Sequence, residues 1–197
     1  MINMSLHLVL FNSRNKDNKS LKNEANKNYK QRSYQFLTHK SVDDPELKQM
    51  FKAFVSKGLP GEVSRFYYSV NARSEDKVQK ALMHYLLDHT TDLTTLDNLA
   101  ARLASKAENR AENKWLFDCD DYTKEDTDKF VEDLTSYAKD ADVVDTVVKT
   151  RSGYHVVVKH GFDTRELLEK HPNVSLKRDE FLYVDSEANT LKWVYEL

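Results

Sequence analysis

Two short stretches of the chain carry the side chains best suited to chemistry. Asp118 and Asp120 close an apolar run, and His155 stands near the start of a later β-branched run. Residues two apart on a strand point to the same side, so the two carboxylates should lie about 7 Å apart on one face. Carboxylates at that spacing suit Mg²⁺ or Mn²⁺, with polyphosphate oxygens completing the coordination. The pattern is typical of metal-dependent phosphoryl transfer.

The turn before His155 offers further groups for binding phosphate. Gly153 permits a tight bend and leaves its amide unobstructed, and Ser152 adds a hydroxyl. His155 can donate to a phosphate oxygen, and nearby cations would add positive charge. These cations are Lys149, Arg151 and Lys159. Taken separately, the acids fit a solvent-exposed strand end and the histidine fits ordinary packing, so it is the combination that indicates a site.

A second surface could bind single-stranded nucleic acid. Arg65 and Arg73 flank an aromatic run that includes Tyr67. Basic residues interleaved with aromatic ones hold single strands by charge and by stacking of the bases. The same alternation also fits half-buried packing of a sheet, and we expect that role for at least one face of this strand.

A third pattern is a pair of His-x-Ser/Thr motifs, beginning at His39 and at His89. Such a pair occurs in two-histidine phosphoesterases, where the histidines act as acid and base on a 2′,3′-phosphodiester. His89 is expected to end a helix, which does not fit the strand position that the motif requires.

Composition narrows the class of protein. The chain has 197 residues, of which 40% are hydrophobic, so it is long enough and apolar enough to bury a core. Cys119 is the only cysteine, which excludes an intramolecular disulfide and a cysteine-based zinc site and fits a reducing cytoplasm. No apolar run approaches the length of a membrane span. Residues 12–40 hold eight basic and two acidic residues, so this arm either binds an anionic partner or is a solvated loop.

The order of predicted elements favours an α+β fold. Helices are expected to begin at Asp44, Ser74 and Thr123, near Leu96, and at Asp163. Strands are expected at 5–11, 34–37, 62–71, 114–119, 142–149, 154–159, 181–184 and 191–195. These elements suit a mainly antiparallel, RRM-like or palm-like sheet with helices on one face and a cleft on the other. Residues 1–61 would form an appendage with a strand, a flexible basic loop and a helix, and residues 62–197 the core.

The Asp-x-Asp strand end and the later hairpin histidine, with a helix between them, resemble the catalytic core of the archaeo-eukaryotic primase superfamily, in the minimal form found in phages and mobile elements. Asp118 and Asp120 match the family's first motif, and the run from Ser152 to His155 matches its second. The third motif is an apolar residue followed by an acid, for which Asp185 is the first candidate and Asp179 the second. The resemblance covers residues 114–185.

The resemblance implies a primase-type nucleotidyltransferase. Asp118, Asp120 and Asp185 would bind two Mg²⁺ or Mn²⁺ ions, and His155 would contact the phosphates of an incoming nucleoside triphosphate. The partner would be a single-stranded nucleic acid template, either DNA or RNA. The chain is small for a complete primase and has no zinc module, so an inactive nucleic-acid-binding module of the same fold is the alternative.

Overall fold

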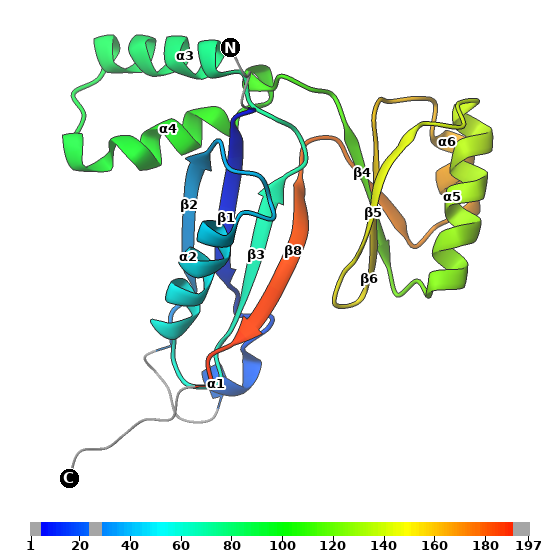
Figure 1. Ribbon diagram of the computed structural model, residues 1–197, viewed down its shortest axis with the longest axis horizontal. Helices are drawn as coiled ribbons and strands as arrows, with labels where there is room; N and C mark the ends of the chain where they lie inside the picture. The colour runs from blue at the N-terminus through cyan, green and yellow to red at the C-terminus, as the bar shows by residue number, and fades with distance from the viewer. Residues whose placement is uncertain (1–4, 24–28, 191–197) are drawn as a thin grey trace.

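The computed structural model describes residues 5–23 and 29–190. Over these residues the chain forms two antiparallel sheets of four strands each and six α-helices (Figure 1). The predicted α+β class with antiparallel pairing is confirmed. The strands, however, form two sheets and not one, and the segment joining β7 to β8 passes from one sheet to the other.

The first sheet has the strand order β2-β1-β3-β8. Its strands are β1 (His7–Ser13), β2 (Arg32–Thr38), β3 (Val63–Ser69) and β8 (Phe181–Ala188). Helix α2 (Pro45–Ser56) covers one face, where Phe11, Phe51 and Phe66 pack together. As expected, α2 begins at Asp44, whose side chain accepts a hydrogen bond from the Glu46 amide. The predicted boundary at residue 61 falls between α2 and β3, inside the part of the chain that builds this one sheet.

The other face of the first sheet is covered at one end by a helical hairpin. It consists of α3 (Glu75–Asp88) and α4 (Leu96–Ala104), and α4 packs against β2. Val78 of α3 is buried with Leu6 and Leu8. The predicted core face of α3 was otherwise wrong, because Leu86 is 39% exposed and Leu82 and Tyr85 are only half-buried. The helix packs along α4 and projects from the body, so its apolar spacing does not meet a core (Figure 1).

The second sheet has the strand order β5-β6-β4-β7. Its strands are β4 (Trp115–Asp120), β5 (Val144–Lys149), β6 (Gly153–Val158) and β7 (Val174–Lys177). The helices α5 (Lys124–Ala138) and α6 (Arg165–Lys170) lie on its outer face (Figure 1). The β5–β6 hairpin was predicted, whereas β7 was not, because its four residues are too few to show a period.

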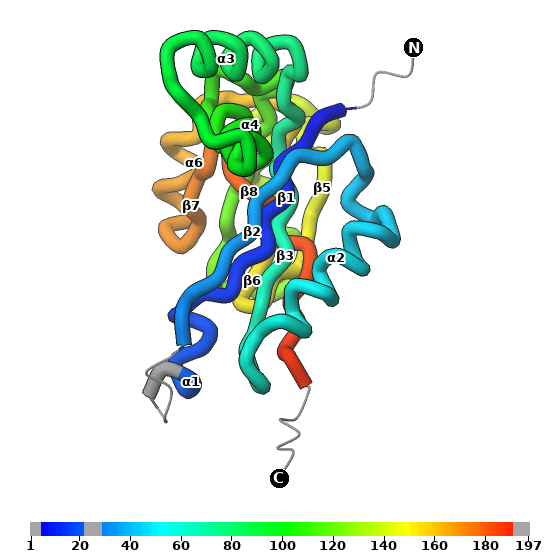
Figure 2. The backbone as a smooth tube through the Cα atoms, turned by 90° about the vertical axis from the view of Figure 1, so that its left-hand side faces the viewer, coloured from blue at the N-terminus to red at the C-terminus, as the bar shows by residue number. Residues whose placement is uncertain are grey.

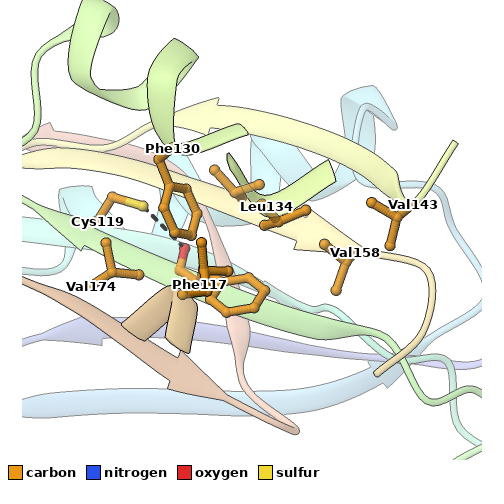
Figure 3. Close-up of a cluster of buried hydrophobic side chains, with 9 residues drawn as sticks. Phe117, Cys119, Phe130, Leu134, Val143, Val158 and Val174 are labelled. Atoms are coloured by element: carbon orange, nitrogen blue, oxygen red, sulfur yellow. Dashed lines mark hydrogen bonds between the residues drawn. The ribbon is translucent and has the colours of Figure 1, made fainter. Parts of the chain in front are cut away.

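A compact apolar cluster joins α5 and α6 to the second sheet. Phe117 and Cys119 of β4 contact Phe130 and Leu134 of α5 in this cluster, and all four are fully buried (Figure 3). Helix α5 begins at Thr123 with the expected capping box, in which the Thr123 side chain and the Asp126 carboxylate each accept from the other's backbone amide. Phe117 and Cys119, on the face of β4 turned toward α5, therefore anchor the strand that carries the acids.

The segment after β1 contains regular secondary structure where a loop was expected. Strand β1 continues to Ser13 and is followed by a turn and the short helix α1 (Lys19–Asn23). The buried Asn18 side chain donates to the Val63 carbonyl at 3.0 Å and accepts from the Val63 amide at 2.7 Å. This pair of bonds fixes the turn to β3. The expected strand at 191–195 lies outside the described residues.

The two sheets meet through a small apolar contact. Val70 and Leu182 on the side of the first sheet pack against Leu116 and Val157 of the second. Figure 2 shows the strands of the first sheet in front of those of the second. Beyond this contact the facing residues become polar, and a cavity opens between the sheets.

Removal of a core side chain should uncouple α5 from the second sheet. Phe130 is fully buried, so Phe130→Ala should lower the free energy of unfolding by about 3–5 kcal/mol. Urea denaturation followed by far-UV circular dichroism measures this. Lys129→Ala, an exposed neighbour on the same helix, is the control and should change stability little. Equal midpoints for the two variants would contradict the packing described.

Candidate functional site

A cavity of about 610 Å³ lies between the inner faces of the two sheets. The second sheet contributes Leu116, Asp118 and Asp120 of β4 to its wall, while Phe117 and Cys119 point into the core behind. The expected alternation along this strand is therefore confirmed. The volume of the cavity lies in the range of small-molecule binding sites.

His155 stands beside Asp118 and links the two sheets. The two residues are paired across β4 and β6, and His155 Nε2 lies 3.4 Å from Asp118 Oδ1. On the other side of the ring, Nδ1 accepts a hydrogen bond of 3.3 Å from the Tyr183 amide of β8. Because Nδ1 accepts, the neutral ring carries its proton on Nε2, the nitrogen that faces the carboxylate. The His155 side chain is 11% exposed.

The surroundings of Asp118 favour its ionised form. The hydrogen bond from His155 lowers the pKa of Asp118, and the positive charge of Lys177 lowers it further, although partial burial acts in the opposite direction. Asp118 is therefore a carboxylate at neutral pH. Cys119, one residue away on the opposite face, is unsuited to chemistry because burial raises its thiol pKa to about 12.

Gly153 has a structural role beside the site. It pairs with Asp120 at the start of β6, and a Cβ atom there would lie 2.0 Å from the Cys119 carbonyl oxygen. No side chain fits at that separation, so β6 can approach β4 only with glycine at this position. Gly153 does not line the cavity, but its close approach supports the register that places His155 opposite Asp118.

The cavity wall carries more basic than acidic side chains. Arg151 and Ser152 of the β5–β6 turn and Arg65 and Tyr67 of β3 line it, so four more of the predicted site residues lie together here. The basic residues around the cavity are Arg14, Lys16, Arg65, Arg151 and Lys177, and the acidic ones are Asp118, Asp120 and Glu180. Such a wall favours a polyanionic ligand.

Several of these residues were not identified from the sequence. Asn12 follows Leu10 on the face of β1 that lines the cavity, and the alternation of residues along this strand could have indicated its position. Arg14 and Lys16 were assigned to a flexible loop, and Lys177 lies on the strand that was not predicted. Tyr183 lines the cavity from β8 and bonds His155 through its backbone, which leaves no signal in its side chain.

Other predicted site residues lie elsewhere. Lys149 lines a separate hollow at the start of α5, and Lys159 is exposed at the end of β6. Arg73 is buried and forms a two-pronged ion pair with Asp179, with both N–O distances at 3.0 Å. Arg73 was predicted to bind nucleic acid, and Asp179 was the second candidate for the third metal-binding acid. In the structure the two side chains neutralise each other.

Asp185, the first candidate for the third acid, is exposed on β8 and does not line the cavity. In the second sheet, the residues opposite Asp118 on the flanking strands are His155 and Ser175, so neither is a carboxylate. Within residues 5–23 and 29–190, no three His, Cys, Asp or Glu side chains come together in a metal-binding group. The carboxylates that share the cavity wall with Asp118 are Asp120 and Glu180.

The two histidines of the phosphoesterase pattern do not reach the cavity. His89 ends α3, where its ring stacks on Tyr85. His39 follows β2 and lies near Glu75 of α3. Neither residue lines the space between the sheets.

Comparison with known proteins adds no family to this picture. The chain matches no protein-family model, no curated protein and no solved structure. None of the helices in the described ranges is long and apolar enough to span a bilayer. The cavity between the sheets is therefore the feature that bears on function.

The contact between His155 and Asp118 predicts a measurable titration effect. His155→Ala should raise the pKa of Asp118 toward 3.8, because the strongest cause of its lowering is removed. Because the pKa of Asp118 is lower in the folded state than in the unfolded state, Asp118 contributes stability that is lost as the pH falls through the folded-state pKa. This contribution should be smaller in His155→Ala. Carboxyl ¹³C NMR measures the pKa. His160→Ala, which removes a partner of Asp140, should leave Asp118 unchanged. An unaltered Asp118 titration in His155→Ala would contradict the contact.

Proposed function

We propose that the chain is a metal-dependent nucleotidyltransferase of the primase type, which works in the cytoplasm on a nucleic acid template with nucleoside triphosphates. The observation that carries the proposal is the convergence of Asp118, Asp120 and His155 with several cationic side chains in one cavity. Carboxylates supply metal ligands, and cations neutralise the phosphates. Both are needed for phosphoryl transfer, in which charge develops on oxygen.

The donor set suits Mg²⁺ or Mn²⁺ bound together with substrate. Asp118 and Asp120 present oxygen ligands from the same face of β4, and the lowered pKa of Asp118 keeps it ionised. Mg²⁺ in nucleotide sites is commonly held by one or two protein carboxylates, with substrate phosphates and water as the remaining ligands. Two protein carboxylates are therefore sufficient for a metal carried in by a triphosphate, and Glu180 is a further carboxylate on the wall. A bound cation would orient the attacking hydroxyl and the α-phosphate.

The chain's own residues have separable roles in this proposal. His155 directs its Nε2 proton toward Asp118, and it would donate that proton to a phosphate oxygen by exchanging the carboxylate for the phosphate. Ser152 and Arg151 approach the cavity from the β5–β6 turn and would bind the phosphates of the same nucleotide. The new bond to the α-phosphorus forms as the bond to pyrophosphate breaks. The basic segment after β1, with Lys16 at the cavity, would hold the template backbone.

The alternative is an inactive nucleic-acid-binding module with the same cavity. The observation in its favour is that Asp185, the acid expected to complete a metal-binding triad, lies outside the cavity. Binding of nucleic acid is common to both functions, and catalysis separates them.

Substitution of the acids should abolish nucleotide incorporation without unfolding the protein. Asp118→Asn and Asp120→Asn should each lower Mn²⁺-dependent incorporation of labelled nucleotide on a single-stranded template by about 100-fold or more, because each removes a charge from the metal site. Primer-extension gels with DNA and RNA templates measure the rate.

Asp121→Asn is a matched control for this experiment. Asp121 directly follows Asp120, lies outside the cavity and has a φ of 60°, which asparagine tolerates. Its activity should equal that of the wild type. Wild-type incorporation that persists in both acid variants would refute the site. Template binding with no wild-type incorporation would establish the inactive module instead.

Binding to single-stranded DNA should depend on salt and on the segment after β1. Each phosphate contact contributes about 0.7 to the slope of log affinity against log salt, so Lys16→Ala should lower the slope by roughly that amount. Fluorescence anisotropy with a labelled oligonucleotide at several salt concentrations measures it. Lys129→Ala on the outer helix should keep the wild-type slope. Equal slopes for all three proteins would exclude Lys16 from the interface.

A further inference from the structure

A buried carboxylate at the edge of the cavity gathers three arginines. Asp17 accepts a hydrogen bond of 3.1 Å from Arg14 Nε and a short one from Arg65. A third guanidinium, that of Arg151, approaches Asp17 Oδ1 at 3.7 Å. The Asp17 side chain is only 5% exposed, and all three arginines line the cavity.

The three arginines come from both walls. Arg65 lies on β3 of the first sheet, and Arg14 lies in the turn that follows β1. Arg151 lies on the β5–β6 turn of the second sheet. Asp17 is therefore the point at which the walls are joined by charge. Its own position is fixed, because the neighbouring Asn18 is bonded on both sides to Val63 of β3.

The contacts on Asp17 differ in strength. Arg65 is held by Asp17 and also donates to the Tyr67 hydroxyl at 3.3 Å, so its direction is set twice. Arg151, in contrast, is beyond hydrogen-bonding distance of Asp17 and is 53% exposed. The Arg65 and Arg14 pairs are fixed parts of the wall, while Arg151 is free to exchange its partner.

The single negative charge of Asp17 does not neutralise the three arginines around it. Burial alone would raise the pKa of Asp17, but the hydrogen bonds from Arg65 and Arg14 outweigh it and lower the pKa below its usual value. One carboxylate thus faces three guanidinium groups, and a net positive charge is left at the cavity wall. Guanidinium groups bind phosphate oxygens through two parallel hydrogen bonds.

We propose that Asp17 is a positioning residue that holds Arg14, Arg65 and Arg151 in place as a clamp for a polyphosphate chain. When the polyphosphate binds, it replaces Asp17 as the partner of Arg151 and so connects the two walls. The inference rests on the proposed function and deepens it, because it assigns the triphosphate tail to the three arginines around Asp17, of which Arg14 lies in the segment after β1. Lys149 and Lys159 lie outside this clamp.

Asp17→Asn tests the clamp with inorganic tripolyphosphate as the probe. The variant removes a negative charge from the site, so a purely electrostatic effect would strengthen binding of the anion. Loss of positioning should instead weaken it roughly tenfold, the effect of about one charged hydrogen bond. Isothermal titration calorimetry measures the dissociation constant. Binding equal to or tighter than that of the wild type would overturn the proposal.

Two further measurements separate positioning from a merely structural role. Asp163→Asn, which breaks an arginine pair on α6 outside the cavity, is the control and should bind tripolyphosphate as the wild type does. In a double-mutant cycle with Arg151→Gln, the effects of Asp17→Asn and Arg151→Gln on binding should be less than additive, because both act on one clamp. Additive effects would overturn the proposal. If Asp17→Asn does not fold, Arg151→Gln is the deciding variant, because Arg151 lies at an exposed turn. Unchanged tripolyphosphate binding by Arg151→Gln would then overturn the proposal.

The clamp and the proposed function fail in different ways. Nucleotide incorporation by the wild type, together with unchanged tripolyphosphate binding by Asp17→Asn, would leave the function standing and remove the clamp. Tripolyphosphate binding that is lost in Asp17→Asn, together with no incorporation by the wild type, would leave the clamp and remove the function. In an active enzyme, Asp17→Asn should raise the KM for nucleotide more than it lowers kcat.

Discussion

The small apolar contact between the two sheets is the constraint on which the site depends. Val70, Leu116, Val157 and Leu182 bring the sheets together over a short distance, and the strands then continue with polar residues on their inner faces. Each sheet has its own helices and its largest core on the outer side, and the α3–α4 hairpin buries a smaller cluster at one end of the first sheet's other face. Because the cores lie outside, the facing surfaces are left to polar side chains, and a cavity results where a single continuous core would have filled the space.

Polar contacts across this cavity keep the two halves in register. The Tyr183 amide of one sheet bonds the His155 ring of the other, and the same ring contacts Asp118. Farther along, Asp17 approaches Arg151 from the opposite wall. The side chains best suited to chemistry are thus also those that connect the sheets, so the geometry of the site and the relative placement of the sheets depend on each other.

The parts of this structure that could be predicted from the sequence are local. The capping box at Thr123, the alternation along β4 and the hairpin before His155 each depend on residues within one element or two adjacent ones. The cavity wall could not be predicted in full, because its members are distant in the chain. The same limit applies outside the wall: Arg73 and Asp179 are 106 residues apart, and nothing in either sequence neighbourhood indicates that they form an ion pair. Asp17 resembled any loop acid until the fold surrounded it with arginines.

The buried thiol of Cys119 gives the molecule a useful property for spectroscopy. It is the chain's single cysteine, it is fully buried behind β4, and its thiol stays protonated at neutral pH because its pKa is about 12. Thiol reagents attack the thiolate, so the folded protein should offer them almost no native background. A pair of cysteines introduced at exposed positions on the two sheets could therefore carry fluorophores or spin labels without removal of Cys119. Distances across the cavity could then be followed in a protein whose core is unaltered.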